Sequence, residues 1–128
     1  YYSRYLNPKK CIGVDLADAQ VEFCRKAYAH DPKLVFYQVL TIFCYSLSLS
    51  LIQGNAQALS EIKELQFEHI DLVTGIDSAH CYPNFRKFVQ EVHKILAPGG
   101  LFLYSDFRPV EEWAQVEKDL KSCFVLSP

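Results

Sequence analysis

Four groups of residues in this sequence stand after apolar runs that are typical of buried strands, and they carry side chains suited to binding or catalysis. They are Asp15, Asn55 with Ala56, the loop 77–82, and Asp106. In an open parallel sheet, ligands bind beyond the carboxyl ends of the strands. These four groups are therefore the places where we expect chemistry.

Each group has a chemical interpretation and a plainer alternative. A single acid after a strand suits a ribose, because one carboxylate can accept hydrogen bonds from both hydroxyls, but Asp15 could equally be an acid at a helix start. Asn55 offers an amide donor and acceptor to an adenine edge, although an ordinary turn asparagine is the commoner case. His80, in the loop, could be a general base or a solvated histidine.

The secondary structure that positions these groups is predicted most clearly for residues 84–106, which form a helix, a turn and a strand. Apolar residues at three- and four-residue steps predict an amphipathic helix that Asn84 caps. The Pro-Gly-Gly sequence at 98–100 ends this helix, and its glycines supply the positive φ angles that reverse the chain. The apolar run 101–105 then predicts a strand covered on both faces.

The rest of the chain alternates strands and helices in the same way. Strands are expected at 11–15, 51–53 and 70–74, and helices at 18–28, weakly at 56–67, and at 110–120 with Val110, Trp113 and Leu120 on its apolar face. This alternation predicts an α/β fold with a parallel sheet flanked by helices. The 128 residues make one domain at most.

Composition excludes several function classes. Thirteen Lys and Arg against fifteen Asp and Glu give a net charge of −2, so no basic surface for nucleic acid or an anionic membrane is expected. The five cysteines are scattered, and neither they nor the four histidines have metal-ligand spacing. We expect neither a disulfide framework nor a metal site, and a reducing, cytoplasmic location.

One stretch, residues 34–52, carries no charged side chain. As a helix it would reach roughly 28 Å, about the thickness of a bilayer core. Its serines and strand-forming residues favour an extra buried strand or hairpin over a membrane span. A third interpretation is that part of it is not native coding sequence. We treat 35–50 as an atypical insertion and expect that it can be deleted without loss of the fold.

The order of these motifs resembles the class I S-adenosylmethionine-dependent methyltransferases. The resemblance rests on Cys-Ile-Gly-Val-Asp-Leu, Gln-Gly-Asn-Ala, Ile-Asp-Leu-Val-Thr and Leu-Ala-Pro-Gly-Gly-Leu. The runs Ser-Ala-His-Cys-Tyr-Pro-Asn-Phe and Leu-Tyr-Ser-Asp-Phe are closer still to the group of phthiotriol and phenolphthiotriol dimycocerosate methyltransferases. Residues 1–33 and 51–123 are covered, and the resemblance implies a partial Rossmann-like methyltransferase fold in a single, incomplete domain.

The resemblance implies S-adenosylmethionine as cofactor and a small-molecule or lipid hydroxyl as methyl acceptor. Asp15 would hold the ribose hydroxyls, with Leu16 packed near the adenine. Asn55, where the family usually has aspartate, would flank the base together with Ala56. Ile76 would lie by the methionine end of the cofactor.

Related small-molecule O-methyltransferases use a histidine after the fourth strand as base, supported by an aspartate after the fifth, and His80 and Asp106 occupy those positions. We therefore predict that His80 takes the proton of the acceptor hydroxyl and that Asp106 orients it. Because both residues follow consecutive strands of one sheet, they are expected to meet at the same edge.

The resemblance also places the first central strand and the glycine-rich loop of the family before residue 1, and its last strands after the matched part. The strands at 11–15 and 70–74 would then lose their shared neighbour, and the chain alone should bind S-adenosylhomocysteine weakly. Two other interpretations stay open: a non-catalytic fragment, and a nicotinamide dehydrogenase fragment in which Asp15 holds an NAD ribose. The Pro-Gly-Gly turn and the His-Cys-Tyr-Pro loop argue against the second.

Overall fold

A computed structural model describes residues 10–14, 18–27, 29–30, 34–37, 43–46, 55–63, 65–66 and 68–127. The strands are β1 (Lys10–Val14), β2 (Leu34–Tyr37), β3 (Phe43–Ser46), β4 (Ile70–Ile76) and β5 (Leu96–Ser105). The helices are α2 (Asp18–Ala27), α3 (Phe85–Ile95) and α4 (Trp113–Lys121), with short 3₁₀ turns η1 (Ala56–Glu61), η2 (Ala79–Cys81) and η3 (Val110–Glu112). The predicted α/β fold is confirmed.

The sheet has the strand order β2-β1-β3-β4-β5. β1 pairs with β2 and β4 pairs with β5 in parallel, as predicted, whereas β3 runs antiparallel to both β1 and β4. Because β1 and β4 are both antiparallel to β3, they run parallel to each other, and their carboxyl ends lie at one edge together with that of β5. The expected loss of a shared neighbour is not observed, since β3 lies between β1 and β4.

The uncharged stretch 34–52 contributes both β2 and β3 to this sheet. The strand that follows α2 is thus β2, whereas the strand predicted at 51–53 lies outside the described residues. Whether 35–50 can be deleted stays a prediction. Within the described ranges, every helix is too short or too polar to cross a bilayer.

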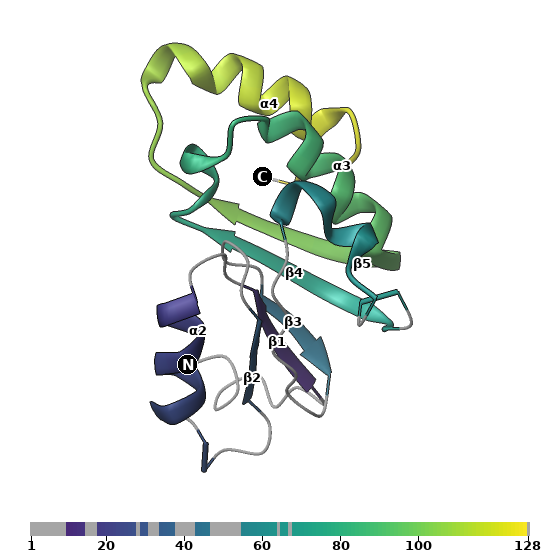
Figure 1. The fold of residues 1–128 in the computed structure, drawn as a ribbon. Helices are drawn as coiled ribbons and strands as arrows, with labels where there is room; N and C mark the ends of the chain where they lie inside the picture. Colours follow the sequence, from purple (N-terminus) through teal and green to yellow (C-terminus); the bar gives the residue numbers. More distant parts are fainter. Residues whose placement is uncertain are drawn as a thin grey trace.

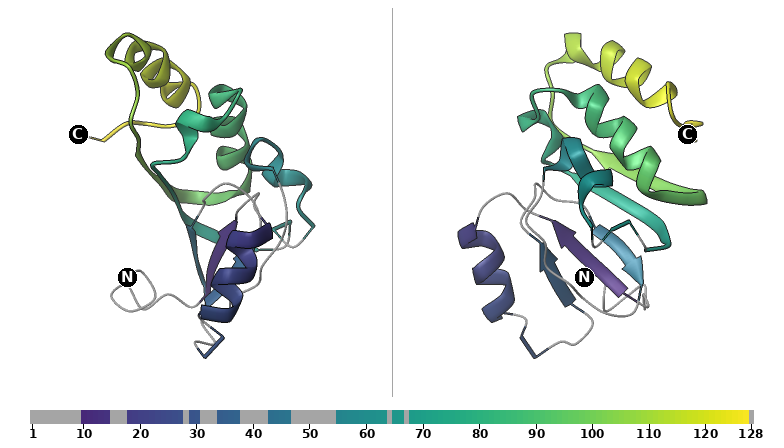
Figure 2. Two further views of the ribbon diagram at one scale, coloured as in Figure 1. Left: turned by 60° about the vertical axis from the view of Figure 1, so that its left-hand side comes forward. Right: turned by 45° about the vertical axis from the view of Figure 1, so that its right-hand side comes forward.

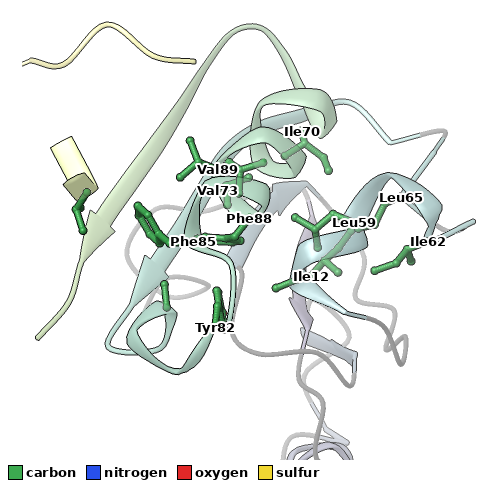
Figure 3. Close-up of a cluster of buried hydrophobic side chains, with 14 residues drawn as sticks. Ile12, Leu59, Ile62, Leu65, Ile70, Val73, Tyr82, Phe85, Phe88 and Val89 are labelled. Atoms are coloured by element: carbon green, nitrogen blue, oxygen red, sulfur yellow. The ribbon is translucent and has the colours of Figure 1, made fainter. Parts of the chain in front are cut away.

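Helix α3 lies between α4 and the β4–β5 pair in each view of Figures 1 and 2, and α2 lies beside β2 at the other end of the sheet. The predicted cap is confirmed, because the Asn84 side chain accepts a hydrogen bond from the Lys87 backbone N–H at 2.9 Å. The apolar face of α3 is buried: Phe85, Phe88, Val89 and Val92. It packs on Val73 and Ile70 of β4 and on Leu59, Ile62 and Leu65 from η1 and the turn after it (Figure 3).

The Pro-Gly-Gly segment differs from its prediction. β5 begins at Leu96, directly after α3, and a register shift between Ile70 and Leu72 of β4 accommodates it. Gly99 has the predicted positive φ, at 81°, but Gly100 does not. Gly100 is required for a different reason: a Cβ there would lie 2.9 Å from the carbonyl oxygen of Ala97.

Two predicted apolar faces are placed differently in the structure. Leu101 and Leu103 are 63% and 52% exposed, so β5 is covered by helices on one face, while the face that carries these two leucines is largely open. The predicted apolar face of the last helix is confirmed only in part. Leu120 packs against the core, as does Val116, and the Trp113 ring contacts that of Tyr104, whereas Val110 lies in η3 and is 86% exposed.

Candidate active site

The carboxyl ends of β4 and β5 are tied together by the residue that follows β4. The backbone N–H of Asp77 donates a hydrogen bond to the carbonyl of Ser105 at 2.8 Å. Asp77 has a φ of 49°, in the left-handed region that non-glycine residues rarely adopt. This sharp turn sends the chain into η2, which carries His80 to the end of β5.

His80 and Asp106 meet at this edge, as their places after consecutive parallel strands predict. The distance between His80 Nδ1 and Asp106 Oδ1 is 2.7 Å. The Asp106 side chain is fully buried, and that of His80 is 40% exposed. An ionised carboxylate can only accept, so Nδ1 carries the proton and Nε2 keeps its lone pair. None of the described residues forms a hydrogen bond with Nε2.

Two more donors hold the Asp106 carboxylate. Its Oδ1 accepts from the Phe107 backbone N–H at 2.9 Å, and its Oδ2 accepts from the Tyr104 hydroxyl at 3.0 Å. Burial by itself would raise the pKa of Asp106, but the hydrogen bonds from His80, Tyr104 and Phe107 outweigh it and lower the pKa. The carboxylate is therefore ionised at neutral pH.

Tyr104 remains a donor to this carboxylate across the neutral pH range. Burial is the main reason that its pKa is raised to about 12, and the neighbouring Asp106 raises it further. The sequence analysis missed Tyr104, although its position two residues before Asp106 places both on the same face of the strand. It also missed Arg108, which donates to the Tyr104 hydroxyl at 3.1 Å, since no local pattern marks that arginine.

The residues predicted to hold the cofactor are placed unequally. Asp15 and Leu16 lie outside the described residues. Ile76, the last residue of β4, is 42% exposed at the carboxyl edge. Ala56 is buried in the core. The side-chain oxygen of Asn55 accepts from the Gln57 backbone N–H at 2.8 Å, which is the N-cap interaction of an ordinary turn asparagine.

One contact nevertheless joins the segment that begins with Asn55 and Ala56 to the end of the His80 loop. The Gln57 side-chain oxygen accepts from the Asn84 backbone N–H at 2.8 Å. The same segment is tied to α3, where the carboxylate of Glu91 accepts from both the backbone N–H and the hydroxyl of Ser60, at 2.8 and 2.7 Å.

A metal ion is the alternative occupant of this edge. One ligand atom each of Asp77, His80 and Asp106 lies within 4.8 Å of the others. However, three donors already occupy the Asp106 carboxylate, and the Arg108 guanidinium lies 3.9 Å from its Oδ2. The arrangement fits a hydrogen-bonded histidine–carboxylate pair better than a metal centre.

Comparisons with known proteins place this geometry in context. A family model described as "Methyltransferase domain" matches residues 1–104. The chain is 33% identical over 120 residues to the phthiotriol/phenolphthiotriol dimycocerosates methyltransferase of Mycobacterium tuberculosis, covering 94% of this chain and 37% of that protein. It is 31% identical over 122 residues to the fatty-acid O-methyltransferase of Mycolicibacterium smegmatis, covering 93% and 37% respectively. The chain thus spans about 37% of the length of these relatives. No solved structure matches it.

Proposed function

We propose that this chain, which belongs to the methyltransferase domain family, carries the general base of an S-adenosylmethionine-dependent O-methyltransferase that acts on the hydroxyl of a small molecule or lipid. The observation that carries the proposal is the 2.7 Å contact between His80 Nδ1 and the buried Asp106. Asp15 alone is also compatible with a nicotinamide dehydrogenase, in which it would bind the NAD ribose. Membership of the methyltransferase domain family favours methyl transfer over that alternative.

The histidine–carboxylate pair favours a hydroxyl acceptor over a carboxyl acceptor. S-adenosylmethionine, when bound, supplies a methyl group made electrophilic by its sulfonium sulfur. A fatty-acid carboxylate is already anionic at neutral pH and needs no base, whereas an alcohol is a poor nucleophile until its proton begins to leave. A base held in one tautomer by a buried acid is useful only for the second kind of acceptor.

The residues of this chain would act in sequence on one proton. His80 Nε2 would accept the proton of the acceptor hydroxyl as that oxygen takes the methyl group. Asp106 stabilises the imidazolium that results, and the exposed edge of the ring returns the proton to solvent. The products are the methyl ether and the neutral thioether of the cofactor.

The described part of the edge fits the cofactor in layout. Ile76 offers an exposed apolar side chain where the resemblance puts the methionine end, and Gln57, two residues after Asn55, accepts from Asn84 at the end of the His80 loop. We propose that these two residues contribute to the cofactor site together with Asp15, Leu16 and the backbone of Ala56. Because the side-chain oxygen of Asn55 caps η1, its NH₂ group is the part that would donate to an acceptor nitrogen of the adenine.

The decisive experiment compares two acceptors in the complete protein and in a His80→Gln variant. With a long-chain alcohol as acceptor, we expect turnover to fall by about 10²–10⁴ while S-adenosylmethionine affinity is preserved. With a fatty acid of the same length, the variant should stay close to the parent. The matched control is His69→Gln, because His69 is exposed at the amino end of β4 and pairs only with Asp71, at 3.2 Å, in the described part of the chain.

Each outcome separates the open interpretations. Equal losses with alcohol and fatty acid would contradict the assignment of His80 as a base for hydroxyls. A His80→Gln variant within a few-fold of the parent on the alcohol would leave proximity of the two substrates as the source of catalysis. A parent without turnover on either acceptor would support the non-catalytic interpretation.

A further inference from the structure

We propose that Arg108 is a positioning residue that holds His80 and Asp106 in their reactive geometry by bonding to the loop that carries His80 and to Tyr104, the hydroxyl of which donates to Asp106. This inference rests on the proposed function, in which the pair is the catalytic base. Arg108 lies between β5 and η3, and its side chain is only 9% exposed although it is charged. A buried guanidinium needs partners for its donors, and these partners identify its role.

The first partner is the backbone of the His80 loop. Nη2 of Arg108 donates to the carbonyl oxygen of Ala79 at 2.6 Å. Ala79 is fully buried and directly precedes His80 in η2. The guanidinium therefore fixes the backbone from which the imidazole projects, across a sequence separation of 29 residues.

The second partner leads to the acid. Nε of Arg108 donates to the Tyr104 hydroxyl at 3.1 Å, and that hydroxyl in turn donates to Asp106 Oδ2 at 3.0 Å. Accepting from the guanidinium leaves the hydroxyl proton of Tyr104 directed at the carboxylate. Arg108 thereby sets the orientation of the acid as well as that of the base.

Two further contacts keep the guanidinium itself in place. Its Cζ lies 4.7 Å from the centre of the Phe85 ring, at the start of α3, and Nη1 donates to Glu112 at 3.2 Å. Glu112 is on η3 and its side chain is 49% exposed. The ion pair with Glu112 thus lies at the protein surface, whereas the bonds to Ala79 and Tyr104 connect Arg108 to the residues that hold His80 and Asp106.

This geometry makes a lysine an unsuitable replacement. A planar guanidinium presents donors in fixed, divergent directions, so it can bond to Ala79 and Tyr104 at the same time. A lysine keeps the positive charge but concentrates its donors on one nitrogen. If only the charge of Arg108 matters, Arg108→Lys should behave like the parent; if the simultaneous bonds to Ala79 and Tyr104 matter, it should not.

The test reads the geometry of His80 without requiring turnover. NMR of histidine-labelled complete protein reports which imidazole nitrogen carries the proton, and the His80 signal is the one lost in His80→Gln. In the parent, the proton should reside on Nδ1. In Arg108→Gln and Arg108→Lys, the ratio of the Nδ1–H to the Nε2–H tautomer should fall by about tenfold, the equivalent of roughly one lost hydrogen bond.

Two control variants separate positioning from other roles. Arg86→Gln removes an exposed arginine from α3, and the tautomer ratio should not change. Glu112→Gln removes the surface partner of Arg108 and leaves both bridging bonds, so its ratio should also match the parent. If Arg108→Gln does not fold, as judged by circular dichroism, Arg108→Lys decides the question, because it keeps the charge in the same place.

The outcomes are distinct from those of the function test. A folded Arg108→Lys variant with the tautomer ratio of the parent would overturn the inference. A Glu112→Gln variant whose tautomer ratio changes as much as that of Arg108→Gln would also overturn it. If the parent has turnover, Arg108→Lys should lower kcat with little change in KM. If it has none, the proposed function fails, and the tautomer ratio still decides the role of Arg108.

Discussion

Replacing Asp106 by Asn tests the proposed catalytic pair, His80 and Asp106, most directly, because the substitution keeps the shape of the side chain and removes its charge. Asp106 accepts three hydrogen bonds: from His80 and the Phe107 N–H at Oδ1, and from Tyr104 at Oδ2. An asparagine has one oxygen and one NH₂ group, so it cannot accept from both sides. Each of its two orientations has a separate consequence.

If the NH₂ group replaces Oδ1, it faces Nδ1 of His80, which must then give up its proton. The proton moves to Nε2, and the imidazole can no longer act as a base there. If the NH₂ group replaces Oδ2, it faces the Tyr104 hydroxyl, and the neutral amide no longer stabilises an imidazolium. Either orientation loses one bond to a charged acceptor, which is worth roughly 1.5–3 kcal/mol.

We therefore expect Asp106→Asn to lower the free energy of unfolding by about 1.5–3 kcal/mol and turnover on an alcohol by about 10²–10⁴. Urea unfolding and steady-state kinetics measure the two effects. The folded-state pKa of Asp106 is lowered, so its stabilising contribution is present above the unfolded pKa and is lost as pH falls through the folded value. The stability difference between parent and variant should thus shrink in acid, below the ordinary value of 3.8.

Asp119→Asn is the matched control, because Asp119 is also a buried aspartate, 6% exposed, but lies on α4 and accepts from Gln115 at 2.8 Å. It should affect unfolding and leave turnover unchanged. An Asp106→Asn variant that keeps the parent stability within about 0.5 kcal/mol and its turnover within a few-fold would refute the reasoning, since both follow from the same three bonds.

Two further substitutions test the scaffold. Glu91→Gln should lower the free energy of unfolding by about 1–3 kcal/mol in urea titrations, because it weakens the bonds from Ser60 and Lys94. Burial raises the pKa of Glu91, but these bonds outweigh it and lower the pKa overall. The loss of stability should therefore be present at neutral pH and decrease below pH 4.5. A loss that persists in acid would indicate that packing, and not the charge of Glu91, is responsible. Thr74→Val should raise the melting temperature, since the fully buried Oγ1 has no hydrogen-bond partner among the described residues, and a lower value would reveal a partner.

The parts of this fold that sequence predicts are those set by local chemistry or by strand direction. The cap at Asn84 depends on residues within one turn, and the apolar face of α3 depends on its period. The contact between His80 and Asp106 follows from the direction of β4 and β5 alone, because residues that follow neighbouring parallel strands lie at the same edge of the sheet. These features required no knowledge of the packing.

The remaining features depend on contacts between distant segments. The antiparallel course of β3 could not be predicted, because an uncharged run without periodicity suits either direction and several partners. Arg108 was missed because its role depends on the reach of a side chain to Ala79, on another loop. Val110 was wrongly assigned to the apolar face of α4 because it precedes the helix, in a turn that the helical period does not describe.

The antiparallel strand β3 has a consequence for how the molecule opens. Among the described residues, β3 pairs with β4 at Phe43–Thr74 and Cys44–Val73, whereas β4 and β5 pair from Ile70–Leu96 to Ile76–Ser105. Within this part of the chain the β3–β4 pairing has the fewest paired residues, so we expect sub-global unfolding to begin there. Local unfolding at this pairing would separate β1, the strand that precedes Asp15, from the β4–β5 pair. The β4–β5 pair would keep His80 and Asp106 together. The contact between His80 and Asp106 would then persist while the backbone amides of β1 exchange with solvent.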